Sequence, residues 1–78
     1  MWIRNYSQDI LICCDNFFID HSDEDYKIKT IISTGIYCLG KYSTKAKALK
    51  VLNIIEDELC DGNDFYQMPL DSEVEDDD

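Results

Sequence analysis

The sequence has no long apolar segment, and its longest uninterrupted apolar run is Ile10–Cys14. A transmembrane helix needs about 20 consecutive, mostly apolar residues, so we expect no membrane-spanning segment. The N-terminus also lacks the basic start and the apolar stretch of a signal peptide. These absences predict a protein that works in the cytosol.

The short motifs that mark common enzyme classes are also missing. The chain contains no G-x-S-x-G, no Walker loop and no dinucleotide-binding fingerprint. Its single histidine, His21, has no Ser or Cys placed to make a recognisable pair of nucleophile and base. We therefore expect neither enzymatic activity nor a cofactor.

Metal-binding patterns are weak. Cys13, Cys14, Cys38 and Cys60 lack the closely spaced pairs typical of zinc sites, and without a secretion signal we expect them to be reduced thiols. The segment 20–25 is rich in oxygen ligands, but it lacks the Gly and the final Glu of an EF-hand loop. We interpret it as a solvated turn and predict no metal site.

Basic residues are absent from the last third of the chain. The chain has a net charge of −10. Residues 1–50 hold all seven Lys and Arg and six acids, a net charge of +1, whereas residues 51–78 hold eleven acids, a net charge of −11. Such a block repels nucleic acids and anionic membranes and attracts basic protein surfaces. The alternative is that the acidity serves solubility alone.

The first half of the chain has the period-two pattern of β-strands. We predict a short strand over 2–4, a turn over 5–9, and a long strand over Ile10–Ile19 with a bulge or bend at Asp15-Asn16. A hairpin follows, with strands over 26–32 and 36–41 around Ser33-Thr34-Gly35. A closing strand is expected over 65–68, ended by Pro69.

One amphipathic helix is predicted from Thr44 to Cys60, with Ser43 as its N-cap and Gly62 at its C-terminal stop. Its apolar stripe has helical spacing and is expected to face the sheet. The stripe consists of Ala48, Leu52, Ile55 and Leu59, widened by Val51.

The charges of this helix oppose its macrodipole, which favours acids at the N-terminus and bases at the C-terminus. The reversed charges are Lys45, Lys47 and Lys50 in the first half and Glu56, Asp57 and Glu58 in the second. Violated local rules concentrate at functional sites. Tertiary partners that offset the cost are the alternative explanation.

These patterns predict an α+β fold. We expect one antiparallel sheet of four to five strands with one helix packed on one face, forming a single small domain over 1–70. With 78 residues, 45% apolar and 31% charged, the chain is long enough for one such domain. Residues 71–78 are predicted to be a disordered, flexible acidic tail.

Several segments resemble a group of short, mostly uncharacterised proteins of phages and prophages of Gram-positive bacteria. The matching segments are Trp2-Ile3-Arg4, Leu39-Gly40-Lys41-Tyr42-Ser43-Thr44 with Lys47-Ala48 and Val51-Leu52, and Phe65-Tyr66-Gln67-Met68-Pro69. They cover about a third of the chain and concern mainly residues that determine the fold. The resemblance implies a phage or mobile-element origin and supplies no catalytic residues.

Charge and resemblance together predict a non-enzymatic accessory protein that inhibits a host defence factor, as anti-CRISPR proteins do. It would present carboxylates to a basic, nucleic-acid-binding surface of a host protein and would not bind nucleic acid itself. The candidate partner-binding residues are Glu56, Asp57, Glu58, Asp61 and Asp64.

Two alternatives belong to other functional classes. In the first, a homo-oligomer encloses a nucleotide immune signal in a pocket of aromatic and cationic side chains, for which Trp2, Arg4, Tyr37 and Tyr66 are the candidates. In the second, the chain is a self-associating structural or regulatory module, a homodimer or a higher oligomer, because exposed strand edges favour pairing.

Overall fold

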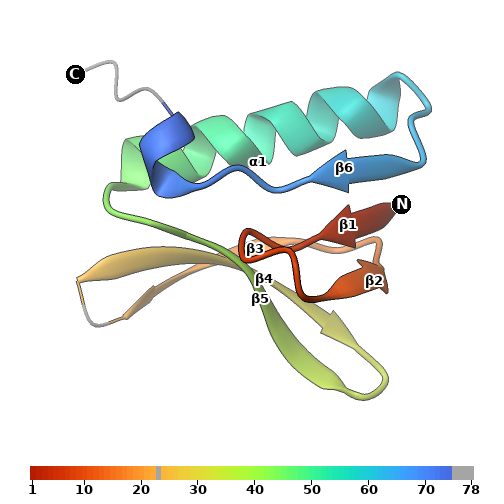
Figure 1. Cartoon of the computed structure of the whole chain (residues 1–78), viewed down its shortest axis with the longest axis horizontal. Coiled ribbons are helices and arrows are strands. Elements are labelled where there is room, and N and C mark those ends of the chain that lie inside the picture. Colours follow the sequence, from red (N-terminus) through yellow and green to blue (C-terminus); the bar gives the residue numbers. More distant parts are fainter. Residues whose placement is uncertain (23, 75–78) are drawn as a thin grey trace.

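The fold was analysed in a computed structural model, which describes residues 1–22 and 24–74 (Figure 1). The α+β class is confirmed: a single long helix covers a set of short strands. The elements are β1 (Trp2–Arg4), β2 (Leu11–Cys13), β3 (Phe18–Ser22), β4 (Asp25–Ile32), β5 (Gly35–Tyr42), α1 (Lys45–Cys60), β6 (Phe65–Gln67) and the 3-10 helix η1 (Asp71–Glu73).

The strands form two three-stranded sheets, where the sequence predicted one sheet of four to five strands. The small sheet has the order β2-β1-β6, and the hairpin sheet has the order β3-β4-β5. All pairs are antiparallel except β1 and β6, which are parallel. The parallel pair arises because α1 lies between the hairpin sheet and β6 in the chain and returns β6 to the side of β1 (Figure 1).

The predicted strand over Ile10–Ile19 is divided at Asp15-Asn16 into β2 and β3, which belong to different sheets. Asn16 makes this break stable. Its side-chain Oδ1 accepts a hydrogen bond from the Ile31 backbone N–H at 2.9 Å, and its Nδ2 donates to the Ile31 carbonyl at 2.9 Å. The Asn16 side chain thus makes the two hydrogen bonds to the Ile31 backbone that a paired strand would otherwise make. The main chain at this point can therefore leave the hairpin sheet.

A β-bulge joins the two sheets. Ile28 pairs with Gly40 and Lys29 with Cys38, so Leu39 has no partner across the ladder. The Leu39 carbonyl instead accepts a hydrogen bond from the backbone N–H of Tyr6, at 2.9 Å, in the loop after β1. The irregularity therefore fixes the small sheet against the hairpin sheet.

Helix α1 begins one residue later than predicted. Thr44, not Ser43, is the N-cap, and its hydroxyl accepts a hydrogen bond from the Lys47 backbone N–H at 3.2 Å. Both residues are good N-caps, and tertiary contacts decide between them because Ser43 is bonded to Asp71. The C-terminal stop is confirmed, since Gly62 follows the helix with a φ of 76°.

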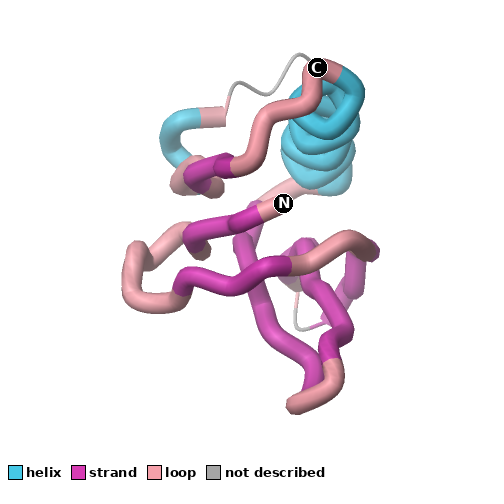
Figure 2. Tube along the Cα trace, turned by 90° about the vertical axis from the view of Figure 1, so that its right-hand side faces the viewer, coloured by secondary structure: helices cyan, strands magenta, loops and turns pink. Residues whose placement is uncertain are grey.

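The core lies between the two sheets and the helix, and its buried residues come from all three (Figure 2). On α1 the buried face is formed by Ala48, Val51 and Ile55. The predicted stripe is wrong at its C-terminal end, because the Leu59 side chain is 43% exposed. The buried face is therefore centred near Val51, and Leu52, partly buried, packs at its margin.

The chain continues to pack beyond Leu70, contrary to the expectation of a flexible tail from residue 71. Residues Asp71–Glu73 form η1, and the Val74 side chain is buried. Immediately before them, the Pro69 carbonyl accepts a hydrogen bond from the Tyr42 hydroxyl at 2.9 Å. Val74 is the apolar residue that packs on the core here, and the acidic composition of this segment gave no indication of it. The rest of the predicted tail, 75–78, lies outside the described residues.

Candidate functional site

The predicted partner-binding residues lie together at the C-terminal end of α1 and in the loop that leads to β6. We call this group the acidic end; it consists of Glu56, Asp57, Glu58, Asp61 and Asp64. All of its members are exposed except Glu58, which is half-buried. Glu56, Asp57 and Asp61 are exposed and so lie away from the buried face of α1.

The backbone beneath the acidic end is ordered by a Schellman motif. The Gly62 N–H donates to the Leu59 carbonyl at 3.1 Å, and the Asn63 N–H donates to the Glu58 carbonyl at 3.0 Å. The following residue, Asp64, is fixed to the small sheet because its carbonyl accepts a hydrogen bond from the Trp2 N–H at 2.7 Å. These bonds order the backbone that carries the carboxylates.

The carboxylates do not form one flat patch. Successive residues of an α-helix are rotated by roughly 100°, so Glu56, Asp57 and Glu58 point in three different directions. Glu58 turns toward the loop, where its carboxylate accepts a hydrogen bond from the Asn63 side-chain amide. Asp57 lies opposite the buried face, one helical turn before Asp61. The acidic end therefore surrounds the end of the helix.

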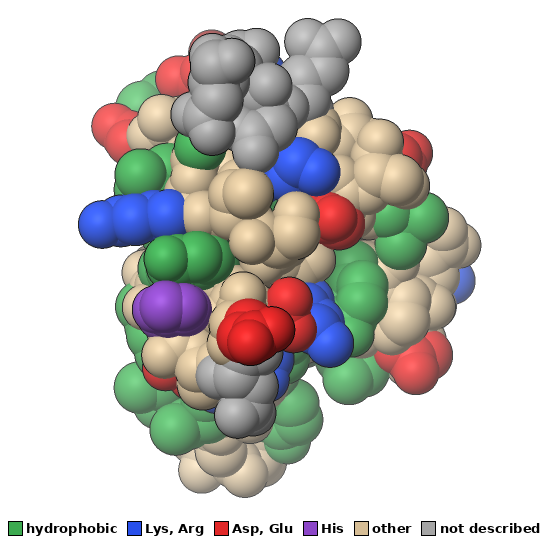
Figure 3. Space-filling view, turned by 90° about the vertical axis from the view of Figure 1, so that its left-hand side faces the viewer, with side chains coloured by type: hydrophobic (Ala, Val, Ile, Leu, Met, Phe, Trp, Pro, Cys, Tyr) green, Lys and Arg blue, Asp and Glu red, His purple; other side chains and the backbone are tan. Residues whose placement is uncertain are grey.

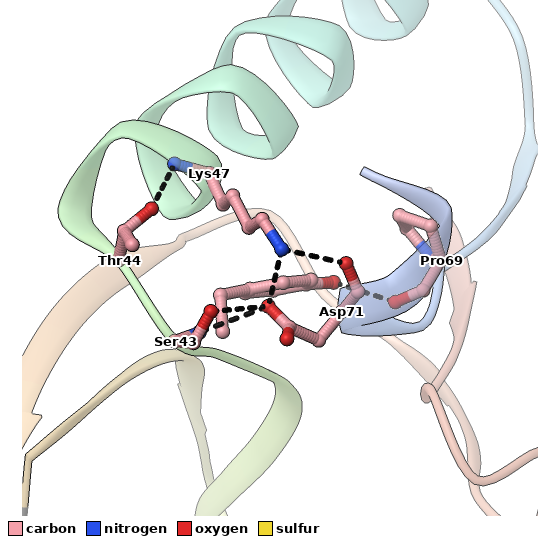
Figure 4. A network of polar contacts seen from close by, with 6 residues as sticks. Ser43, Thr44, Lys47, Pro69 and Asp71 are labelled. Carbon is pink, nitrogen blue, oxygen red and sulfur yellow. Dashed lines mark hydrogen bonds and ion pairs between the residues drawn. The ribbon is translucent and has the colours of Figure 1, made fainter. Parts of the chain in front are cut away.

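The N-terminal end of α1 differs from the acidic end, because its Lys47 is paired with an acid (Figure 4). The Lys47 ammonium lies 3.4 Å from the Asp71 carboxylate and also donates to the Asp71 backbone carbonyl at 3.2 Å. The same carboxylate accepts hydrogen bonds from the Ser43 N–H at 2.9 Å and from the Ser43 hydroxyl at 3.1 Å. We call this arrangement the Asp71 latch.

The latch perturbs the titration of its carboxyl group. The hydrogen bond from the Ser43 backbone N–H, supported by the Ser43 hydroxyl and by Lys47, lowers the pKa of Asp71 below its ordinary value. A negative charge beside the first turn of a helix also suits the macrodipole. The unfavourable charge of Lys47 is thus offset by a residue distant in sequence.

The hairpin sheet pairs its charges in the same manner. Lys29 lies 2.6 Å from Asp20, and Lys41 lies 3.3 Å from Asp25. The hydrogen bond from Lys29 lowers the pKa of Asp20. Figure 3, which views the molecule from the side opposite the acidic end, shows acidic and basic side chains mixed over this surface. Charges of both signs therefore meet here, in contrast to the acidic end.

The residues of the ligand-binding alternative are not brought together. Arg4 lines a pocket beside β1, while Tyr66 lines a different one between β6 and α1. Tyr37 lies on the hairpin sheet, where its hydroxyl is 3.0 Å from that of Thr34. Trp2 is exposed on the small sheet. No described pocket combines these four side chains.

The described residues contain neither a metal centre nor a membrane-spanning helix. Within residues 1–22 and 24–74, no three His, Cys, Asp or Glu side chains gather in a way that could hold a metal ion. The described part of the chain also contains no helix long and apolar enough to span a membrane. The four cysteines are free thiols, and Cys13 and Cys60 are exposed.

Sequence reasoning missed one surface. The outer face of the small sheet exposes Trp2, Leu11 and Phe65 around Arg4. Strands of three residues are too short for an alternation that would reveal which side chains face outward. The available signal was composition, since three aromatic residues occur in the short strands Trp2–Arg4 and Phe65–Gln67.

Comparison with known proteins adds no relative. No protein-family model, no curated protein and no solved structure matches this chain. Function is therefore argued from the fold, the charges and the exposed surfaces.

Proposed function

We propose that this protein is a non-enzymatic binding protein whose acidic end docks on a basic surface of a host protein. The observation that carries the proposal is the acidic end itself. Five carboxylates are held on ordered backbone at one end of the molecule, within a stretch, 51–78, that contains no Lys or Arg.

The electrostatics of the helix support this proposal. The C-terminal end of a helix carries a partial negative charge of about half an elementary charge, from its unpaired carbonyls. The carboxylates of Asp57 and Asp61 lie one turn apart and repel each other. A basic partner surface would relieve this repulsion and would be attracted over about 8 to 10 Å at physiological ionic strength.

The partner in this proposal is a host defence protein, and the contacted surface is its nucleic-acid-binding groove. Such a groove is lined by Lys and Arg that contact phosphates. Carboxylates that point in several directions around a helix end suit a concave basic groove better than a flat patch. The resemblance to phage and prophage proteins is what suggests a defence factor.

In the test, the full-length protein is immobilised and exposed to a lysate of the bacterial host. Each protein that is retained is then purified for a binding assay. The decisive comparison is between two single charge reversals. Asp57→Lys alters the acidic end, and Glu24→Lys alters an exposed acid in the β3–β4 turn. Both change the net charge equally. A true partner should lose at least about tenfold in affinity for Asp57→Lys, or about 1.4 kcal/mol, and little for Glu24→Lys.

Two further results are required. Affinity for the wild type should fall as salt rises, because the attraction is between charges exposed before binding. A duplex oligonucleotide bound to the partner should be displaced by the wild type and not by Asp57→Lys. Equal affinity of both variants, or binding that is indifferent to salt, would contradict the proposal.

A further inference from the structure

The outer face of the small sheet exposes three large apolar side chains on ordered strands. Trp2 is 49% exposed, Phe65 51% and Leu11 56%. The register places them on one face, because Trp2 lies beside Phe65 and Arg4 lies beside Leu11. The alternate residues Ile3 and Ile12 are buried on the other face.

One end of this face is hollow. A pocket of about 310 Å³ is lined by Arg4, Leu11 and Phe65 together with the loop residues Gln8, Asp9 and Ile10. This volume is at the lower limit of ligand pockets, about 300 Å³, so it suits one large side chain. The Arg4 side chain is held there because its Nε donates to the Gln8 carbonyl at 3.1 Å.

The two ends of the face differ in charge. Arg4 and Asp9 both line the pocket end, so their charges offset each other. The Trp2 end is flanked on both sides by acids: Asp64 precedes Phe65 on the β6 side, and Asp15 lies two residues after Cys13 on the β2 side. Both acids are exposed. A face with an exposed indole and acids at one end, and a pocket lined by an arginine at the other, can pack on a second copy of itself after a half-turn.

We propose that a second copy of this chain packs on this face across a two-fold axis near Ile3. The axis places each Trp2 over the pocket of its partner, with the indole against Arg4, where a cation and an aromatic ring attract each other. It also sets Arg4 near Asp15 and Asp64 of the partner subunit. The interface is isologous and closes, so it forms a dimer.

The dimer is weak. Stable interfaces bury about 800 Å² on each partner, and three strands of three residues with one loop offer less than that. The full chain exposes 4880 Å², and its acidic ends repel each other at long range. The acidic end stays outside this interface except for Asp64, so the inference goes beyond the proposed function.

Sedimentation equilibrium and tryptophan fluorescence test the dimer directly. Trp2 is the only tryptophan of the chain, so its emission reports on this face alone. As the protein concentration rises from about 1 μM to 1 mM, the mass should rise from 9.1 kDa toward twice that value, and the emission should shift to the blue. A monomeric mass throughout, or a shift in mass without a shift in emission, would overturn the proposal.

Two substitutions separate this face from nonspecific association. Phe65→Glu should raise the dissociation constant at least tenfold, because a charge would replace an apolar wall of the pocket. Ile36→Glu is the matched control, since Ile36 is 62% exposed on the hairpin sheet; its dissociation constant should stay within twofold of that of the wild type. Equal loss in both variants would overturn the proposal.

A charge exchange tests the orientation of the two copies. Arg4→Glu should raise the dissociation constant at least tenfold, because it places like charges opposite each other. Adding Asp15→Lys and Asp64→Lys should restore dimerisation to within about threefold of the wild type. Thermal unfolding at low concentration verifies that each monomer remains folded, and Asp57→Lys, which only lowers the repulsion between the acidic ends, should not weaken dimerisation. Failure of the restored variant to dimerise, while still folded, would refute the two-fold arrangement.

Discussion

The two ends of helix α1 carry charges of the wrong sign for its macrodipole, and the fold treats them differently. At the N-terminal end, Lys47 is paired with Asp71, whose carboxylate also receives the Ser43 N–H. At the C-terminal end, Asp57 and Asp61 are exposed and lie in a stretch without any basic residue. Tertiary structure thus offsets the charge of Lys47, whereas Asp57 and Asp61 stay exposed to solvent.

The difference shows where a charge pattern predicts function. The lysines of the first turn looked as anomalous in sequence as the acids of the last turn. Only the structure distinguishes them, because the residue that neutralises Lys47 is 24 positions away. The cost of an unfavourable end charge, about 0.3 to 1 kcal/mol, is thus offset for Lys47, whereas Asp57 and Asp61 are exposed in a stretch without Lys or Arg.

The largest effect is expected in the middle of α1, between the two ends. Val51→Asp should unfold the domain, because it places an unpaired charge at a fully buried position. A loss of more than about 4 kcal/mol is close to the whole stability of so small a domain. Circular dichroism during a urea titration would measure it.

Leu59→Asp is the matched control for that substitution, since it belongs to the same predicted stripe but lies at the exposed end. Its cost should stay below about 1 kcal/mol. An equal loss of stability in both variants would mean that the last turn of α1 is packed as tightly as its middle. The C-terminal end would then belong to the packed fold, contrary to the contrast drawn between the two ends.

The end of α1 that carries the Asp71 latch depends on the packing of Tyr42. A Cβ at Gly40 would lie 2.5 Å from the Tyr42 hydroxyl oxygen and 2.7 Å from its ring. Tyr42 is fully buried and donates to Pro69, so its ring cannot move without loss. Gly40→Ala should therefore cost about 2 kcal/mol by overpacking. Unfolding in urea that matches the wild type would show that the Tyr42–Pro69 contact is not needed.

The Asp71 latch should contribute less, because its carboxylate is partly exposed. Asp71→Asn should cost about 1 kcal/mol at pH 7, whereas Ser72→Ala, an exposed neighbour, should cost almost nothing. The measurement is the midpoint of thermal unfolding for the three proteins in the same buffer. Equal midpoints for all three would remove the latch from the account.

The latch also predicts a pH dependence with a defined sign. The pKa of Asp71 is lowered in the folded state, so its contribution is present above the ordinary value of 3.8 and is lost as the pH falls through the lowered value. The stability difference between wild type and Asp71→Asn should therefore be full at pH 7 and should shrink below about pH 4. A difference that grows in acid would contradict it.

Much of the secondary structure was accessible from the sequence, and the sheet topology was not. Alternation located the hairpin and the helical spacing located α1. The split at Asp15-Asn16 looked like a bulge, because nothing local shows that the Asn16 side chain bonds to Ile31 across 15 positions. The predicted N-cap is one residue too early for a similar reason, because the N–H and the hydroxyl of Ser43 donate hydrogen bonds to Asp71.

The candidate site, too, could be predicted from the sequence only in part. Composition located the acidic end, and the exposure of Asp57 and Asp61 agrees with it. Sequence could not show that Asp71, assigned to a flexible tail, belongs to the fold, because the burial of Val74 depends on the surface it meets. Nor could it show the outer face of the small sheet, which depends on β1 and β6 becoming neighbours.

The central claim is that the exposed carboxylates of Asp57 and Asp61 cost the fold stability instead of holding it together. The most direct test is the free energy of unfolding of Asp57→Lys at low salt, compared with Glu24→Lys. A lysine at position 57 would suit the macrodipole and attract Asp61 one turn away. We predict that Asp57→Lys is more stable than Glu24→Lys by about 0.5 to 1 kcal/mol. A variant less stable than both the wild type and Glu24→Lys would show that the carboxylate holds the fold and would contradict the account.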